Sequence, residues 1–242
     1  MACDNEGGDI VEWRHYSSIM KDLLALEGSP VAITYSMAPV GGGLDGRFAA
    51  CQALTAAAEG AVINLSKDNA GCPGGIWHLG LVPRPSGDHD KVLKDFLVNG
   101  EKLFSSVAAF HRCMAMTSPP PEGLASYVVM SPLEGAQIMP DLVVVLCNPE
   151  QACRLVTLAT YQSGRPPRVE MAGSTCHMVV AYPIVTGELN VSLMDYTERK
   201  SQKRRPDQLF VTIPYHLMPG LVWSIDRCGA GNAVMLPFPN SQ

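Results

Sequence analysis

The sequence predicts a single two-lobed domain of the mixed α/β class, in which a mixed sheet is flanked by helices. Strand-sized apolar runs, such as residues 31–36 and 142–146, alternate along the chain with segments of helical periodicity. The length of 242 residues lies near the upper limit of what one hydrophobic core supports. Hydrophobic residues make up 47% of the chain and charged residues 17%, which favours a folded protein over a disordered one.

The first part of the chain predicts two helices and two strands. Tyr16, Met20 and Leu23 share one face of the first helix, and Gly60 ends the second. Glycines let the loop that follows turn sharply. The expected elements are, in order, a helix over residues 9–26, a strand over 31–36, a helix over 47–59, a strand over 61–65 and a loop over 69–75.

The rest of the chain contains the clearest local signal. The continuous apolar run 142–146 is typical of a strand covered on both faces. Directly after it, Asn148 is a suitable N-cap, Pro149 suits the first helical position and Gln151 completes a capping box. The expected helices cover residues 90–99, 102–116, 148–162 and 219–226, and the expected strands cover 127–130, 142–146, 169–171, 178–183, 189–194 and 209–213.

Composition and charge limit the classes of protein to which this chain can belong. The formal net charge of −5 argues against a general nucleic-acid binder, and no apolar run approaches the roughly 18 residues that a membrane span needs. The acidic start of the chain lacks the basic and apolar regions of a secretory signal, so we expect a cytoplasmic protein. We expect residues 9–225 to form the fold, with residues 1–8 and 229–242 as flexible tails.

Eight cysteines are the most informative chemical feature, and in the cytoplasm they are thiols or metal ligands rather than disulfides. Cys51 lies in a predicted helix, where a thiol is more often a small core residue. Cys72 lies in a loop in which Gly74 and Gly75 permit close backbone approach to a bound group. Cys176 follows a glycine loop just before a predicted strand, a place that suits either a ligand or the core.

Three thiolates that converge on one point suit an iron–sulfur cluster or another soft metal, because thiolates select such centres. Of these we expect an iron–sulfur cluster of the 4Fe–4S type. Three ligands leave one iron position open for a small molecule, as in catalytic metal sites. The spacing of Cys51, Cys72 and Cys176 does not identify the cluster. Cys147 is a reserve fourth ligand, whereas Cys153 is expected to be structural within its helix.

Two histidines and one helix start are further candidates. His78 and His177 lie near the thiols in sequence and are candidate ligands or proton carriers, although most histidines have neither role. The helix start at Asn148, with Glu150 and Gln151, is a potential anion site because its N–H groups are free. The basic run 199–205 is expected to be a solvated loop, with phosphate binding as the alternative.

Nine short segments of the chain form a recognisable pattern: PVAI at 30–33, CQAL at 51–54, CPGG at 72–75, LGL at 79–81, SPLE at 131–134, PDLV at 140–143, NPEQ at 148–151, TC at 175–176 and IP at 213–214. Together they resemble domain-of-unknown-function family 169, over roughly residues 10–225. The resemblance implies a prokaryotic, largely anaerobe-associated protein, places Cys51, Cys72 and Cys176 in the shared pattern, and carries no established activity. The family more often has a small residue at the position of Cys147.

These observations support three hypotheses. The first is a cytoplasmic iron–sulfur protein, a reductase or lyase, whose open iron meets a small anion beside the Asn148 helix start. The second is a metal-free module that binds a small anionic ligand, with structural cysteines. The third is a thiol enzyme with Cys72 as nucleophile and His78 or His177 as base. A homodimer is expected from the base rate for soluble proteins.

Overall fold

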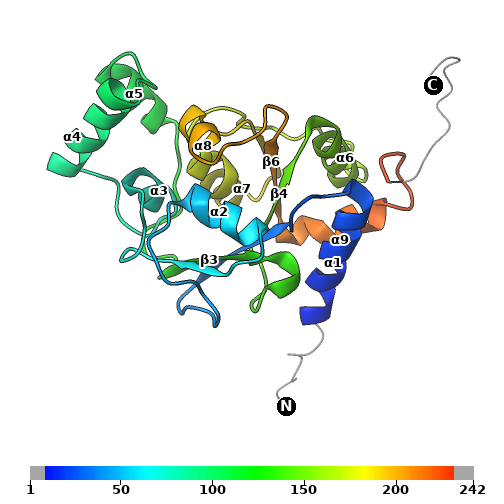
Figure 1. Ribbon diagram of the computed structural model, residues 1–242. Coiled ribbons are helices and arrows are strands. Elements are labelled where there is room, and N and C mark those ends of the chain that lie inside the picture. The colour runs from blue at the N-terminus through cyan, green and yellow to red at the C-terminus, as the bar shows by residue number, and fades with distance from the viewer. Residues whose placement is uncertain (1–8, 232–242) are drawn as a thin grey trace, which may run out of the picture.

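The computed structural model of the chain describes residues 9–231, which form an antiparallel six-stranded sheet with helices on both faces (Figure 1). The strand order is β2-β3-β1-β4-β6-β5. The predicted mixed α/β class, with a sheet flanked by helices, is confirmed. The sheet itself is antiparallel in all pairings between the named strands, and not mixed as predicted. The strands are β1 (Val31–Ser36), β2 (Ile63–Leu65), β3 (Tyr127–Pro132), β4 (Leu142–Cys147), β5 (Asn190–Ser192) and β6 (Leu209–Pro214).

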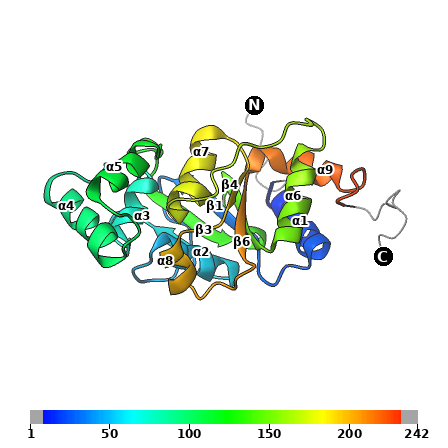
Figure 2. The ribbon, with the colours of Figure 1, turned by 90° about the horizontal axis from the view of Figure 1, so that it is seen from above.

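The helices outside residues 87–115 divide into two groups, one for each face of the sheet, as the view from above shows (Figure 2). The described helices are α1 (Asp9–Leu24), α2 (Ala50–Ala58), α3 (Pro73–His78), α4 (Gly87–Asp95), α5 (Val107–Ala115), α6 (Pro149–Thr160), α7 (Tyr182–Thr186), α8 (Tyr196–Ser201) and α9 (Met218–Ser224). Two π-helical segments, Phe96–Gly100 and His177–Ala181, continue α4 and precede α7, and two 3₁₀ turns cover Leu133–Gly135 and Tyr215–Leu217.

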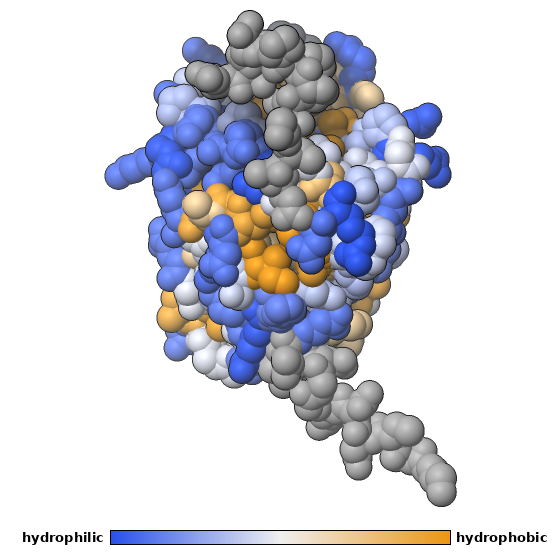
Figure 3. Space-filling model, turned by 90° about the vertical axis from the view of Figure 1, so that its right-hand side faces the viewer, coloured by the Kyte–Doolittle hydropathy of each residue, from blue (hydrophilic) through white to orange (hydrophobic). Residues whose placement is uncertain are grey.

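The residues of β4 show why both faces are covered. Val143 and Val145 pack into the core shared with α1, α6 and α9, whereas Leu142 and Val144 pack into the core shared with α2. Successive side chains of a strand point to opposite faces, so a strand buried on both faces reads as one continuous apolar run. The outer side of the α1, α6 and α9 layer carries a patch of hydrophobic residues at its centre (Figure 3).

Residues 87–115 form a small helical lobe beside the sheet body, which we call the cap lobe. It contains α4, the π-helical segment Phe96–Gly100 and α5, and it projects away from the sheet (Figure 1). Its own small core joins Leu93, Phe110 and Met114 to Trp77 of α3. The α3 helix therefore connects the cap lobe to the body.

One predicted strand is helical in the structure. Residues 178–183 belong to the segment His177–Ala181 and to α7, and Met178, Val179 and Val180 are fully buried there. A short apolar run cannot distinguish a buried strand from a buried helix, and the continuous burial of this segment explains the error. The predicted strand over 169–171 has no strand structure. The expected tails, apart from residues 229–231, lie outside the described residues.

The helices of the described part of the chain include none that is long and apolar enough to cross a membrane.

Candidate functional site

Cys51, Cys72 and Cys176 line one cavity of about 450 Å³ between the cap lobe and the sheet body. The predicted ligand-binding residues Gly74 and Gly75 line the same cavity, which we call the thiol cavity. The cap lobe contributes mainly apolar side chains to the lining, which we call the cap-lobe wall, and the sheet body contributes most of the polar residues. The structure thus brings together residues that lie 125 positions apart in the sequence.

Each of the three cysteines lies at the start of a helix. Cys51 is in the first turn of α2, and Cys72 is the N-cap of α3, whose first residue is a proline. Cys176 lies in the first turn of a helix in which the carbonyl of Ser174 accepts hydrogen bonds from the N–H groups of His177 and Met178. Helix starts present N–H groups and favour negative charge, so the local backbone suits thiolates.

Glycine at position 75 lets α3 pass close to the thiols. A Cβ added there would lie 3.2 Å from the Sγ atom of Cys176 and 3.8 Å from the Cβ atom of Cys72. A Cβ at Gly74 would lie 3.9 Å from the Sγ atom of Cys72. Side chains at these positions would therefore occupy the space around the thiols.

The environment of the thiols disfavours the ionised form. Burial raises the pKa of Cys51 to about 11, and the nearby Glu198 and Cys72 contribute in the same direction. Burial likewise raises the pKa of Cys176 well above its usual value, with further contributions from Cys72 and Cys51. The described residues that line the cavity include no lysine or arginine. A cationic group bound between the thiols would supply the missing positive charge.

A buried carboxylate, Glu198, lies beside the thiols in the lining of the cavity. Its Oε1 atom accepts a hydrogen bond from Nε of Arg204 at 2.9 Å, whereas its Oε2 atom is buried without a hydrogen-bond partner. Burial raises the pKa of Glu198, although Arg204 opposes the shift. Sequence reasoning missed this residue, which immediately precedes the basic run 199–205 that was expected to be a solvated loop.

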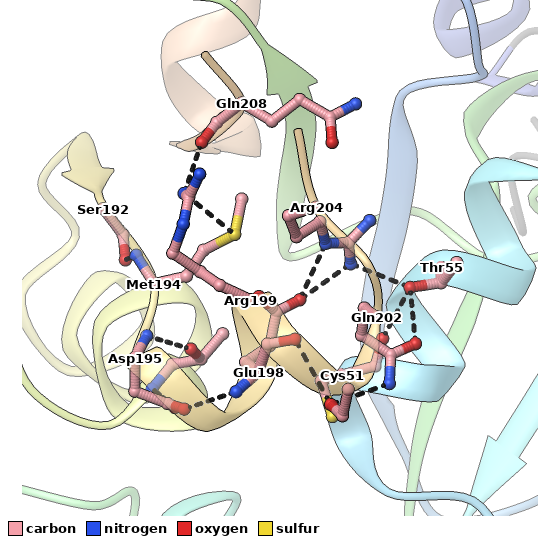
Figure 4. A network of polar contacts seen from close by, with 12 residues as sticks. Cys51, Thr55, Ser192, Met194, Asp195, Glu198, Arg199, Gln202, Arg204 and Gln208 are labelled. Carbon is pink, nitrogen blue, oxygen red and sulfur yellow. Dashed lines mark hydrogen bonds and ion pairs between the residues drawn. The ribbon is translucent and has the colours of Figure 1, made fainter. Parts of the chain in front are cut away.

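The helix α8 anchors the helices of two cysteines (Figure 4). Arg204, just beyond α8, donates to Oγ1 of Thr55, and that hydroxyl donates to the carbonyl of Cys51. At the start of α8, Asp195 Oδ2 accepts from the backbone N–H of Thr175 at 2.9 Å, and Thr175 Oγ1 accepts from the Asp195 N–H at 2.8 Å. These contacts fix the positions of Cys51 and Cys176 relative to each other.

The two predicted histidines differ in placement. His78 lines the thiol cavity, is stacked on Trp77 with the ring centroids 3.8 Å apart, and has a buried Nδ1 atom with no hydrogen-bond partner. Burial, together with His177 and Arg84, lowers the pKa of His78 to about 3. His177 is not among the residues that line the cavity.

The ring of His177 is held by its own neighbours. Its Nε2 atom accepts from the Ser118 N–H at 3.3 Å, and its Nδ1 atom lies 3.3 Å from Oε2 of Glu170. Because Nε2 accepts, the proton of the neutral ring is on Nδ1 and faces Glu170. Of the two histidines, His78 is therefore the one available to a molecule in the cavity.

Within residues 9–231, no group of three or more His, Cys, Asp or Glu side chains is placed to hold a single metal ion. An ion bound at about 2.3 Å would hold its thiolates about 4 Å apart, whereas thiolates on the corners of an iron–sulfur cluster lie roughly 6–7 Å apart. The arrangement of the three thiols is therefore not that of a mononuclear site.

The structure does not bring the helix start at Asn148 to the thiols. Asn148 and Gln151 line a different cavity, of about 220 Å³, and Glu150 is exposed. The predicted capping box is present: Asn148 Oδ1 accepts from the Gln151 N–H at 2.9 Å, and Gln151 Oε1 accepts from the Asn148 N–H at 2.8 Å. The side-chain oxygens of Asn148 and Gln151 therefore stabilise the start of α6.

The remaining cysteines also have clear places. Cys147, the reserve ligand, lines the cavity of Asn148 and not the thiol cavity. Cys113 lines the thiol cavity, but burial and Glu170, rather than the three thiols, raise its pKa. Cys153 is exposed, although its helix position predicted a structural role. Cys228 is buried, and Cys3 lies outside the described residues.

The basic run 199–205 is held within the fold rather than solvated throughout. The guanidinium of Arg199 donates to the carbonyls of Leu193, Gln208, Arg205 and Pro206. Arg204 is buried against Glu198, and Arg205 pairs with Glu27 at 2.5 Å. Much of the positive charge of this run is therefore already paired or used by backbone oxygens.

Comparison with known proteins identifies one family. The DUF169 family model, described as "Uncharacterised ArCR", matches residues 19–223. No curated protein and no solved structure matches the chain.

Proposed function

The chain belongs to the DUF169 family, and we propose that it is a cytoplasmic iron–sulfur protein that binds a small molecule at an open iron position. Cys51, Cys72 and Cys176 would hold a cluster of the 4Fe–4S type. The observation that carries the proposal is that these three thiols, from three separate helix starts, line one cavity with no lysine or arginine among its described lining residues.

Charge balance supports a cationic centre at this position. Burial is the main cause of the raised pKa values of Cys51 and Cys176, and the neighbouring thiols and Glu198 raise them further. Three thiolates without a cation would therefore be unfavourable at this position. Iron binding favours the thiolate form and releases the protons, so the same thiols that resist ionisation alone become good ligands. Core packing does not require three thiols at one cavity.

The bound cluster would supply an iron with an open coordination position, able to act as a Lewis acid or to transfer an electron. The chain's own residues would orient the molecule bound there. Gly74 and Gly75 leave room beside the thiols, His78 offers a neutral imidazole, and Glu198 offers a carboxylate oxygen. An anionic donor group on the small molecule would be favoured at this position, because bound iron is a cation.

A second candidate is a metal-free binding module. The thiol cavity of about 450 Å³ favours it, since this volume lies within the range of small-molecule sites. A third, the thiol enzyme with Cys72 as nucleophile, has His78 on the same cavity as its candidate base.

Anaerobic purification tests the proposal. We expect brown protein with a broad absorption band near 400 nm and about four iron and four sulfide ions per chain. Colourless, folded protein that takes up no iron and sulfide on anaerobic reconstitution would refute the cluster and favour the metal-free module. Stoichiometric alkylation of Cys72 that depends on His78 would favour the thiol enzyme.

We also propose a homodimer. The hydrophobic patch on the α1, α6 and α9 layer supports it (Figure 3). These helices also carry partly buried hydrophobic residues, namely Leu23, Val156 and Val222. Light scattering should give twice the chain mass of 26.0 kDa. The mass of a single chain at micromolar concentration would refute the dimer.

A further inference from the structure

We propose that the thiol cavity binds a small molecule with an uncharged aromatic or alkyl body and one polar end that faces His78 and Glu198. The part of this inference that concerns iron binding by the polar end rests on the proposed cluster. The part that concerns the aromatic or alkyl portion of the molecule depends only on the residues that line the cavity. The inference therefore narrows the ligand from any small anion to an amphipathic molecule.

The side chains that the cap lobe contributes to the cavity suit an aromatic or alkyl group of a bound molecule. The residues that it contributes share large hydrophobic side chains: Leu93, Phe96, Leu97, Leu103, Phe104 and Met114. Phe96 is 53% exposed although it is one of the larger apolar side chains. It stands at the first position of a π-helical segment, a rare geometry that occurs often at functional sites.

The charges around the cavity disfavour a free anion. Glu101, Asp195 and Glu198 line it, and no lysine or arginine does so among the described residues. Burial raises the pKa of Glu101 and also that of Glu198, so negative charge is already costly there. An anionic group would need a cation, such as bound iron, to enter this site.

Three residues that line the cavity each have a buried polar atom with no hydrogen-bond partner, namely Trp77 Nε1, His78 Nδ1 and Glu198 Oε2. Buried polar atoms are nearly always hydrogen-bonded, and unpaired ones cost free energy. His78 and Glu198 line the cavity and are each only 3% exposed, so we infer that a molecule bound beside them, rather than bulk water, supplies the partners. The polar end of that molecule is therefore expected to carry hydrogen-bonding groups.

Binding of three naphthalene probes of matched size tests the inference. The probes are 2-naphthalenemethanol, which is neutral, 2-naphthylmethylammonium, which is a cation, and 2-naphthoate, which is an anion. Each is titrated by anaerobic calorimetry into full-length protein with and without reconstituted iron. We expect the neutral and cationic probes to bind protein without iron, and 2-naphthoate to bind at least tenfold more tightly after iron is loaded.

Two variants locate the binding. Phe96→Ala should weaken the neutral probe about tenfold, because part of the apolar contact is lost. The control Val92→Ala, on the same lobe, should leave binding unchanged, since Val92 is 68% exposed and does not line the cavity. Equal effects of the two variants would overturn the assignment of the wall.

The possible outcomes separate the two proposals. Neutral-probe binding that depends on Phe96, in protein that never takes up iron, would support the apolar site and refute the cluster. Failure of the neutral probe to bind, or equal affinity of 2-naphthoate and the neutral probe without iron, would overturn this inference even if the cluster is present.

Discussion

A Cβ at Gly75 would stand 3.2 Å from the Sγ atom of Cys176, so the α3 backbone passes directly against this thiol. Alanine has a helix propensity roughly 1 kcal/mol better than glycine, and therefore should not destabilise α3 itself. The added methyl group would nevertheless press on the cysteine that it faces. Replacement of Gly75 by alanine therefore tests the space around the thiols without a large expected change in the stability of the fold.

We predict that Gly75→Ala lowers iron incorporation at least twofold while the free energy of unfolding changes by about 1 kcal/mol or less. Gly135→Ala is the matched control, because a Cβ there meets nothing within 4 Å. Iron analysis after reconstitution gives the iron content. Urea denaturation of the iron-free proteins gives the free energy of unfolding. Full iron content in Gly75→Ala would show that the space beside Cys176 is not needed.

Thiol reactivity should follow burial. At pH 8 without metal, we expect iodoacetamide to modify exposed Cys153 first and Cys51 and Cys176 much more slowly. With a pKa of about 11, only about one Cys51 thiol in a thousand is ionised at that pH. Peptide mass spectrometry against time measures each rate. Modification of Cys51 or Cys176 as fast as Cys153 would contradict the raised thiol pKa of these two cysteines.

The cap at Asn148 should matter for stability and not for the cluster. Asn148→Ala removes the oxygen that accepts from the Gln151 N–H and should lower the free energy of unfolding by about 1 kcal/mol. Asn148→Asp keeps a capping oxygen and should restore most of the loss. Iron content should be equal in all three proteins. A loss of iron in Asn148→Ala would connect the two cavities.

Glu134 should make the fold sensitive to acid. Burial alone would raise the pKa of Glu134, but hydrogen bonds from Lys21, Ser29 and Ser17 lower it to about 2. A depressed carboxyl pKa stabilises the fold above the unfolded value of 4.5, and this stabilisation is lost as the pH falls toward 2. Because the side chain is 38% exposed, we expect about 1–2 kcal/mol.

Denaturation of Glu134→Gln at several pH values checks this expectation. The variant should be less stable than the natural chain at pH 7, and the difference should shrink between pH 4.5 and 2. Glu150→Gln, with a side chain 70% exposed, is the control and should change little. A pH-independent difference for Glu134→Gln would mean that ionisation of this carboxyl does not stabilise the fold.

The sequence predicted correctly those elements whose own residues reflect how they are buried or capped in the fold. β4 is a continuous apolar run because it is buried on both faces, and α6 begins at Asn148 because its capping box is local. The short helix α3 was missed because Gly74 and Gly75 are poor helix formers. Its position is set instead by packing between Cys176 and the cap lobe.

The candidate site was predicted only in part. The three cysteines and the two glycines were identified from the sequence, and the structure places them on one cavity. Glu198 and the cap-lobe wall could not be identified, because they reach the cavity through contacts between distant segments. Thr55 and Arg204, for example, are hydrogen-bonded although 149 positions separate them. No local pattern encodes such a pair.

Iron bound per chain in serine variants tests the central claim most directly. Cys51→Ser, Cys72→Ser and Cys176→Ser, each reconstituted anaerobically, should lose most of the iron and the absorption near 400 nm, because all three thiolates hold one cluster. Cys113→Ser should keep both, since Cys113 lines the same cavity but has Glu170 rather than the three thiols as its charged neighbour. Full iron content in any one of the three variants, with the fold intact, would contradict a cluster shared by Cys51, Cys72 and Cys176.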